Sequence, residues 1–252
     1  MGNLWQKQPD SYHGLLMRCA PGTHEAAAKM LGDNRIANCP VLDLASGSGA
    51  FLARLCDQGF DHLHAVELDP SRFGLPGIKP IAADLNADFA SVIDAALGCK
   101  RFGLVSAIEI IEHLDCPRHF LRQVRTLLAD DGHLLLSTPN VANFTGRIRF
   151  AVSGQLRQFR ENDYHYQRHI SPIAEVQMRL MLGEIGFRLV DAVTAGCFFG
   201  PVKKAVLSPA ILLARLLWGS IGSEDVRIYL AQKSAPDTTS PGRSSDYIQR
   251  GA

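Results

Sequence analysis

The chain has 252 residues, of which 46% are hydrophobic and 20% charged, a composition typical of a soluble globular protein that can bury a full core. Its formal net charge of +1 gives no overall basic footprint for nucleic acid, so a nucleic-acid partner is not expected. Six scattered cysteines without a C-x-x-C pair argue against a disulfide framework or a zinc site and indicate a reducing, cytoplasmic location. No apolar run reaches the ~18 residues of a membrane-spanning helix.

Short apolar or β-branched runs alternate with helix-forming segments along the chain. Helices are expected at 21–37, 49–59, 87–98, 116–132 and 171–186, with Thr23 and Ser171 as the N-caps of the first and last. Strands are expected at 39–46, 62–69, 79–85, 101–111, 133–139, 187–195 and 225–234. This alternation predicts an α/β fold with βαβ crossovers: a doubly wound, Rossmann-like, seven-stranded and mostly parallel sheet with helices on both faces.

The domain organisation follows from these elements and from composition. An N-terminal helical cap is expected at 1–38, and the main domain at 39–233. The domain carries a lid insertion at 144–169 and an apolar insertion at 197–222. The segment 234–252 is rich in Ser, Pro, Gly and Thr and is expected to be disordered.

The first strand–loop–helix turn, "VLDLASGSGAFLARL", contains two closely spaced glycines. In a doubly wound sheet the ligand lies outside the carboxyl ends of the strands, and Gly47 and Gly49 let the backbone approach it here. Leu52 stands where a dinucleotide fingerprint has its third glycine, which argues against NAD or FAD. Glu67 ends the next strand and lies 18 residues beyond Gly49, close to the ~20-residue spacing at which an acid meets ribose hydroxyls.

Five segments in this part of the chain resemble the class I S-adenosylmethionine-dependent methyltransferases, in the family's order and spacing. They are "VLDLASGSG", "HAVELD", "IAADL", "RFGLVSAIEIIEHL" and "LLADDGHLLLSTPN". The resemblance implies S-adenosyl-L-methionine as the cofactor. Its methionine part is expected at the Gly47 and Gly49 loop, its ribose diol at Glu67, and its adenine at Asp84 and Leu85. The expected cofactor site is completed by Asp43, Ala45, Leu68 and Glu109.

The resemblance has two departures and one alternative. Ala45 stands where the family usually has its first glycine, and Gly103 where an aspartate often begins the fourth strand. A small residue at position 45 is expected to weaken cofactor affinity at most. Asp84 has a structural alternative, in which its side chain only caps a turn or helix.

The stretch "IEIIEHLDCPRH" places two glutamates and a histidine directly after an apolar run. If the chain turns helical after Glu109, then Glu109, Glu112 and His113 share one face. In one interpretation the acids favour the N-terminus of the next helix and His113 is their partner. In the other, the three side chains bind Mg²⁺ or another divalent cation that orients and activates an acceptor hydroxyl.

The E-x-x-E-H pattern is similar to that of ubiquinone-pathway O-methyltransferases and of small-RNA 3′-terminal ribose 2′-O-methyltransferases. In the latter a downstream histidine completes the metal site, and "NDYHYQRHISP" offers His165 and His169. His169 is the favoured ligand, and His165 is either a second ligand or a general base. With His113, these two are the candidate catalytic residues. Alternatively, the two downstream histidines only line a lid.

The two insertions indicate which molecules the protein could bind: an acceptor, a membrane surface or a second copy of the chain. The lid carries five arginines against two acidic residues, with interleaved aromatic side chains, and this favours an anionic acceptor. Most of these arginines have a second interpretation, as a solvated basic helix face. The apolar insertion is interpreted as a core-covering helix, a dimer contact, or an interfacial helix that brings 203–218 to a membrane surface. A monomer and a homodimer are both compatible with the sequence.

Together these features predict an S-adenosylmethionine-dependent O-methyltransferase acting on a small hydroxylated metabolite or glycan, with metal assistance as a hypothesis. Methylation of an RNA 3′-end is the alternative reaction, disfavoured by the near-neutral charge and by the lack of an appended RNA-binding module. A catalytically silent S-adenosylmethionine-binding interaction protein is the alternative outside the enzymes. A nicotinamide oxidoreductase is disfavoured by Leu52.

Overall fold

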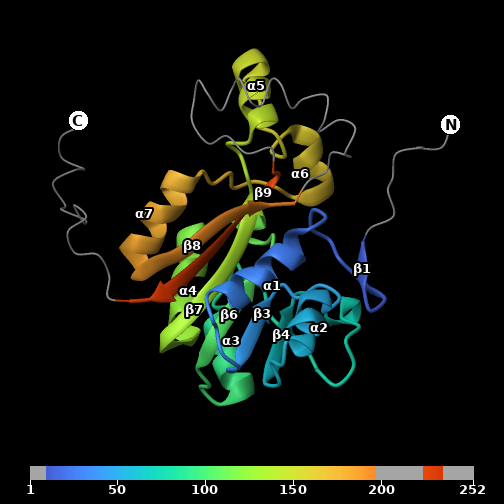
Figure 1. Ribbon diagram of the computed structural model, residues 1–252, viewed down its shortest axis with the longest axis vertical. Helices are drawn as coiled ribbons and strands as arrows, with labels where there is room; N and C mark the ends of the chain where they lie inside the picture. The colour runs from blue at the N-terminus through green and yellow to red at the C-terminus, as the bar shows by residue number, and fades with distance from the viewer. Residues whose placement is uncertain (1–9, 197–223, 235–252) are drawn as a thin grey trace.

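A seven-stranded sheet organises the computed structural model, which describes residues 10–196 and 224–234 (Figure 1). The strand order is β5-β4-β3-β6-β7-β9-β8. The first five strands in this order pair in parallel, and β9 runs antiparallel to both β7 and β8. The strands are β3 (Val41–Leu44), β4 (Leu63–Glu67), β5 (Ile81–Ala82), β6 (Phe102–Ala107), β7 (Leu128–Pro139), β8 (Phe187–Ala195) and β9 (Val226–Lys233). The predicted seven-stranded, mostly parallel sheet is confirmed.

Seven α-helices and two short 3₁₀ turns connect the strands within the described ranges. The helices are α1 (Thr23–Asp33), α2 (Ala50–Asp57), α3 (Phe89–Leu97), α4 (Pro117–Leu127), α5 (Phe144–Ser153), α6 (Glu161–Gln167) and α7 (Glu175–Ile185). The 3₁₀ turns are η1 (Pro70–Arg72) and η2 (Ile111–His113). A small hairpin of β1 (Ser11–Tyr12) and β2 (Leu15–Leu16) precedes α1. None of the helices described is long and apolar enough to cross a membrane.

Helices cover both faces of the sheet, so both faces are buried. Successive strand residues point to opposite sides, and neighbouring residues therefore enter different clusters. Leu42 and Leu44 pack with α3, α4 and α7, whereas Val41 packs with α1 and α2 on the other face. Leu52 is fully buried in the second of these clusters, as expected for a residue that packs α2 on the sheet. The helices α5 and α6 stand beyond the carboxyl ends of the parallel strands, within the segment 144–169 that is predicted to be a lid (Figure 1).

Both predicted N-caps are wrong. The cap of α1 is Gly22, in the left-handed conformation with φ of 89°, and Thr23 is the first helical residue. The last helix begins at Glu175, after Ala174. Ser171 instead donates a hydrogen bond from Oγ to the Leu114 carbonyl oxygen at 2.7 Å, so it fastens the lid end to the segment after β6.

The region after β6 also differs from the expected helix. Glu109 has φ of 52°, a left-handed conformation, and the η2 turn starts two residues later. Glu109 therefore does not share a helical face with Glu112 and His113. The apolar insertion 197–222, for which a membrane contact through 203–218 is one interpretation, lies entirely outside the described residues. The tail from residue 235 onward lies outside them as well.

Candidate active site

One cavity of about 900 Å³ opens at the carboxyl ends of β3, β4 and β6. Its walls come from the segment before α1, the glycine loop, the turn after β6 and the lid. Eleven of the predicted site residues line it: Asp43, Ala45, Gly47, Glu67, Leu68, Asp84, Leu85, Glu109, Glu112, His113 and His169. Its volume is in the range of small-molecule and cofactor sites.

The glycine loop bends sharply at the mouth of this cavity. Ala45, Gly47 and Gly49 all have positive φ, of 56°, 54° and 89° respectively. A Cβ on Gly47 would meet no atom within 4 Å, so this glycine leaves open space where the cofactor is expected. A Cβ on Gly49 would instead lie 2.8 Å from Leu75 Cβ and 2.9 Å from Phe73. Gly49 does not line the cavity, and its role is to let the loop pack against the chain after β4.

Glu67 faces the loop from the end of β4. Its Oε2 accepts a hydrogen bond from the Gly47 N–H at 2.8 Å, and its Oε1 accepts one from the Leu68 N–H at 3.1 Å. Each carboxylate oxygen has two lone-pair sites, so each keeps capacity for a ribose hydroxyl. Glu67 thus fits the ribose role while it also holds the loop in shape.

Asp84 and Leu85 lie farther along the same wall. Leu85 is buried and lines the cavity, whereas Asp84 is exposed at its rim. Asp84 Oδ1 accepts a hydrogen bond from the Asn86 N–H at 2.9 Å, which is a turn-capping contact. The capping alternative for Asp84 is therefore present in the structure, and a contact with adenine remains compatible with it.

Asp43 is buried beneath the glycine loop. Its Oδ1 accepts a hydrogen bond from Ser106 Oγ at 2.6 Å, and its backbone carbonyl accepts one from Ser46 Oγ at 2.7 Å. Burial raises the pKa of Asp43 to about 7, against the opposing effect of the hydrogen bonds from Ser106 and Ser46. Asp43 thus joins β3 to β6 and fixes the start of the loop.

Two buried carboxyl groups lie deeper in the cavity, where Glu109 and Glu112 follow β6. Glu109 Oε1 accepts a hydrogen bond from Ser137 Oγ at 3.0 Å, and Glu112 Oε2 accepts one from Thr138 Oγ1 at 3.2 Å. Burial raises the pKa of Glu109 to about 7. Burial, together with the charge of Glu109, raises the pKa of Glu112 well above its usual range. A cation in this place would favour the ionised form of both acids.

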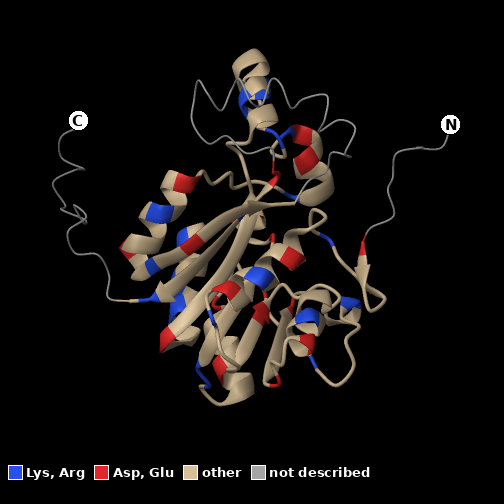
Figure 2. Cartoon of the chain, in the orientation of Figure 1, with Lys and Arg blue, Asp and Glu red and all other residues tan. Residues whose placement is uncertain are grey.

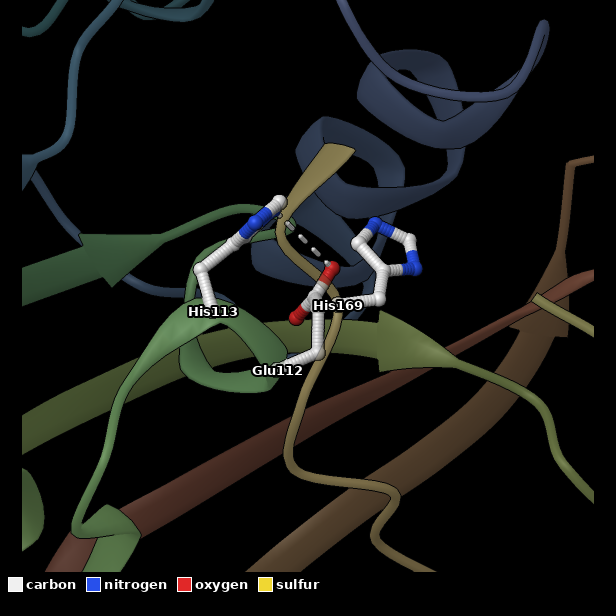
Figure 3. Close-up of side chains that lie close together, drawn as sticks. All are labelled: Glu112, His113 and His169. Carbon is white, nitrogen blue, oxygen red and sulfur yellow. Dashed lines mark ion pairs between the residues drawn. The ribbon is translucent and has the colours of Figure 1, made fainter. Parts of the chain in front are cut away.

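Glu112, His113 and His169 converge from the η2 turn and the end of the lid (Figure 3). One potential ligand atom from each lies within 4.8 Å of the others. In this view the Glu112 carboxylate lies between the two imidazole rings, whose centroids are 4.7 Å apart. The chain returns here because the backbone N–H groups of Ile170 and Ser171 both donate to the Glu112 carbonyl oxygen at 3.0 Å.

The protonation of the two histidines suits them as cation ligands. Burial lowers the pKa of His113, and the neighbouring His169 lowers it further. Burial likewise lowers the pKa of His169. The His169 Nδ1 lies 2.8 Å from the Gln158 carbonyl oxygen, which can only accept, so Nδ1 carries the proton. The lone pair of the neutral ring is then on Nε2, as a metal ligand requires.

One buried polar atom in this group fits a divalent cation. Glu112 Oε1 makes no hydrogen bond with any of the described residues, and its side chain is completely buried. His113 Nε2 lies 3.9 Å from this oxygen, too far for a hydrogen bond. A carboxylate oxygen buried without a partner is costly. A divalent cation bound by Glu112, His113 and His169 would satisfy it with a donor set of one oxygen and two nitrogens.

Two predicted residues are not brought into this group. Glu109 lies outside it because its left-handed backbone turns the carboxyl group toward Ser137. His165 does not line the cavity, since its exposed side chain projects from α6 and lies 3.8 Å from Glu161. The structure therefore supports neither His165 as a second ligand nor His165 as a general base.

The segment before α1 contributes wall residues that the sequence analysis did not identify. Arg18, Cys19 and His24 line the cavity beside the glycine loop. Burial lowers the pKa of His24 to about 4, so its ring is neutral. No motif in the sequence marks these residues, because their place depends on how α1 packs on α2.

The charge of the lid is divided between its two helices (Figure 2). Arg147 and Arg149 lie on α5, whereas Glu161 and Asp163 lie on α6. Neither arginine of α5 lines the cavity. The lid arginines that do line the cavity are the three outside α5, namely Arg157, Arg160 and Arg168, and Asp163 lines it beside them.

The family model described as a methyltransferase domain matches residues 11–192 of the chain. This chain belongs to the methyltransferase domain family. The prediction of an S-adenosylmethionine-dependent methyltransferase is thereby confirmed, together with its Rossmann-like fold.

Relatives of this methyltransferase include two proteins named ubiquinone biosynthesis O-methyltransferase. The one from Azorhizobium caulinodans is 26% identical over 79% of this chain and 73% of the relative. The one from Paraburkholderia phytofirmans is 24% identical, and the match spans only 54% of this chain and 60% of the relative.

Solved structures agree with the fold. A SAM-dependent methyltransferase from Archaeoglobus fulgidus has a TM-score of 0.54 at 17% identity, covering 84% of this chain and 95% of that one. The magnesium protoporphyrin IX methyltransferase from Synechocystis PCC 6803, solved with bound SAH, has a TM-score of 0.55 at 15% identity, covering 84% and 82%. At these identities the similarity establishes the fold alone.

Proposed function

We propose that this methyltransferase transfers the methyl group of S-adenosylmethionine to a hydroxyl oxygen of a small acceptor that carries two neighbouring hydroxyls. The observation that carries the proposal is the unpartnered Glu112 Oε1 beside two neutral imidazoles, in the same cavity as the glycine loop and Glu67. The O-methyltransferase names of the relatives support transfer to oxygen.

The cofactor end of the cavity is formed by the loop and the strand ends. Gly47 leaves room for the methionine part, and Glu67 has free lone pairs for the ribose hydroxyls. Leu85 supplies an apolar surface suited to the adenine. These contacts hold the reactive methyl group in one place, and such positioning supplies much of the rate of a displacement reaction.

The acceptor end is formed by Glu112, His113 and His169. A divalent cation held there would orient two acceptor oxygens and lower the pKa of the one to be methylated. The acceptor O–H releases its proton to water, the oxygen forms a bond to the methyl carbon, and the carbon–sulfur bond breaks so that its electron pair stays on the sulfur of S-adenosylhomocysteine. The neutral histidines remain available as ligands throughout the ordinary pH range because their pKa values are lowered.

An anionic group on the acceptor is proposed to meet Arg168. Arg157 and Arg160 also line the cavity, but Arg157 pairs with Asp225 and Arg160 with Asp163. Arg168 forms no ion pair with the residues that the structure describes, and its guanidinium lies over the Tyr164 ring at 5.4 Å. Among the lid arginines of this wall, Arg168 is therefore the one proposed to pair with an anionic group of the acceptor.

The test uses purified protein, labelled S-adenosylmethionine, and three acceptors: catechol, a catechol carboxylate, and phenol. We expect methylation of the two diols, with the carboxylate preferred, and loss of methylation with EDTA that Mg²⁺ restores. Glu112→Gln is expected to abolish this activity. Glu184→Gln, which alters an exposed carboxylate on α7 paired with Arg118 at 3.0 Å, is the control. EDTA-insensitive methylation that survives in Glu112→Gln would remove the metal and keep the methyltransferase.

A further inference from the structure

His169 is held in place by a chain of contacts that begins on the sheet. Its Nδ1 donates to the carbonyl oxygen of Gln158, eleven residues earlier in the lid. The second nitrogen of a metal-binding histidine ring is aimed by the partner of the first. The position of the Gln158 carbonyl therefore decides where His169 Nε2 points.

Gln158 has an unfavourable backbone conformation for its type. Its φ of 69° lies in the left-handed region, which residues with a side chain rarely adopt. Such a conformation persists only when surrounding contacts impose it. Two contacts to one residue do so here.

Those contacts converge on Asp225. Arg157 Nη1 pairs with Asp225 Oδ1, and Gln158 Nε2 donates to the Asp225 carbonyl oxygen at 3.5 Å. Arg157 Nη1 also donates to Thr145 Oγ1 at 3.1 Å, at the start of α5. Arg157 and Gln158 are thus both bound to Asp225, which directly precedes β9, and Arg157 is also bound to the start of α5.

Asp225 is itself held in place by burial and by several hydrogen bonds. Its side chain is fully buried, and its backbone N–H donates to the Gly196 carbonyl oxygen at 2.9 Å. Its carbonyl oxygen accepts from the Asn140 N–H at 2.8 Å. Its carboxylate accepts from Asn143 Nδ2 at 3.1 Å, and Asn143 Oδ1 caps α5 through the Gly146 N–H at 2.7 Å. The ends of β7, β8 and β9 and the base of the lid meet at this residue.

We propose that the Arg157–Asp225 pair is a positioning device that sets the Gln158 carbonyl against His169 and so aims His169 Nε2 at the shared ligand position with Glu112 and His113. Arg157 and Asp225 act here as positioning residues, since they reach the ligand position through Gln158 and His169. The metal side of this inference rests on the proposed function. The orientation of the ring does not.

The first measurement reports on the ring alone. Side-chain ¹⁵N NMR of histidine distinguishes which ring nitrogen carries the proton. We expect the Nδ1–H form of His169 in the wild type. Arg157→Gln should mix the two forms, and Arg157→Lys, which keeps a cation near Asp225, should restore most of the wild-type signal.

The second measurement is the affinity for Mn²⁺, followed by calorimetry without any acceptor or cofactor. Removing a partner of a metal-binding histidine weakens metal affinity by about tenfold or more, so Arg157→Gln should weaken the Mn²⁺ affinity by about that factor. Gln158→Gly keeps the carbonyl and tolerates positive φ, so it should retain the affinity within about threefold.

The matched control is Arg227→Gln. Arg227 is also a largely buried arginine, its side chain 24% exposed against 17% for Arg157, and its Nη2 pairs with Glu175 at 2.7 Å. It lies on β9 and does not line the cofactor cavity. Arg227→Gln should lower thermal stability about as much as Arg157→Gln, yet leave the His169 signal and the Mn²⁺ affinity unchanged.

The outcomes separate this inference from the proposed function. An unchanged His169 signal in folded Arg157→Gln would overturn the positioning device, whatever the metal does. A mixed signal in a protein whose wild type binds no Mn²⁺ would keep the device and refute the metal site. If Arg157→Gln does not fold, Gln158→Ala takes its place, because it removes the side-chain contact to Asp225 and disfavours the positive φ. It should mix the two ring forms, and an unchanged His169 signal in that variant would overturn the positioning device.

Discussion

Replacing Glu112 by glutamine is expected to stabilise the metal-free protein and to abolish its response to metal. The Glu112 carboxyl group is completely buried with a raised pKa, and its Oε1 has no hydrogen-bond partner in the described part of the chain. An unsatisfied buried polar atom costs about 1–3 kcal/mol, and a charged one more. The neutral amide keeps the shape of the side chain, and its oxygen still accepts from Thr138 Oγ1. At pH 8 without metal, Glu112→Gln should therefore unfold at a higher temperature than the wild type.

The size of both effects follows from linkage. For a chain of this length, 1 kcal/mol moves Tm by about 2–4 °C, so the metal-free variant should gain about 2–12 °C. A ligand at one hundred times its Kd stabilises the folded state by about 2.7 kcal/mol. Saturating Mn²⁺ should thus raise the Tm of the wild type by about 5–10 °C. It should leave that of Glu112→Gln unchanged.

The assay is thermal unfolding with EDTA and with a Mn²⁺ series, on the wild type, Glu112→Gln and the control Glu184→Gln. The control changes an exposed carboxylate and should behave as the wild type in both conditions. The reasoning is refuted if Glu112→Gln lowers the metal-free Tm, because the carboxylate would then be a stabilising structural group. It is equally refuted if the variant keeps the full Mn²⁺ shift.

Three further changes probe the scaffold of the site. Ala45→Gly removes the strain of a left-handed alanine with φ of 56°. After the entropy cost of glycine is subtracted, we expect the free energy of unfolding to rise by up to about 1 kcal/mol. A lower free energy of unfolding in a urea titration would contradict this. Gly103→Ala would place a Cβ 2.6 Å from Cys39 Cβ and 2.7 Å from its Sγ, which should lower the free energy of unfolding by about 1–3 kcal/mol. The double variant with Cys39→Gly removes this clash and should regain the lost stability. Burial raises the folded-state pKa of Asp43 to about 7, above the ordinary aspartate value of 3.8, so the folded state keeps a proton that the unfolded state releases. Stability should fall by about 4 kcal/mol as pH rises from about 4 to 7, and Asp43→Asn should flatten this slope; parallel profiles would refute the assignment.

The departure at Gly103 shows why a family pattern needs the structure. The sequence alone marks Gly103 as an unusual residue at the start of the fourth strand. The packing explains it, because the Cys39 side chain occupies the space that a Cβ would take. The departure at Ala45 has a different meaning, since this alanine adopts the same left-handed conformation that glycine would adopt more easily.

The sequence by itself determined the fold and the gathering of most residues predicted for the cofactor in one cavity. Alternating strand and helix patterns are local properties, and parallel strands bring their carboxyl ends to one edge of the sheet. The glycine loop, Glu67, Asp84 and Leu85 therefore lie on one cavity wall, as their order along the chain predicts.

Only the tertiary structure decided the arrangement of the residues proposed to bind the acceptor. The choice between His165 and His169 depends on a chain reversal, in which Ile170 and Ser171 bond to the backbone of Glu112. The left-handed turn at Glu109 directs this carboxyl group to Ser137 and away from the histidines. The Arg157–Asp225 pair joins residues 68 positions apart. Contacts over such distances leave no periodic pattern in the sequence, because each depends on packing between elements that the chain brings together only when it folds.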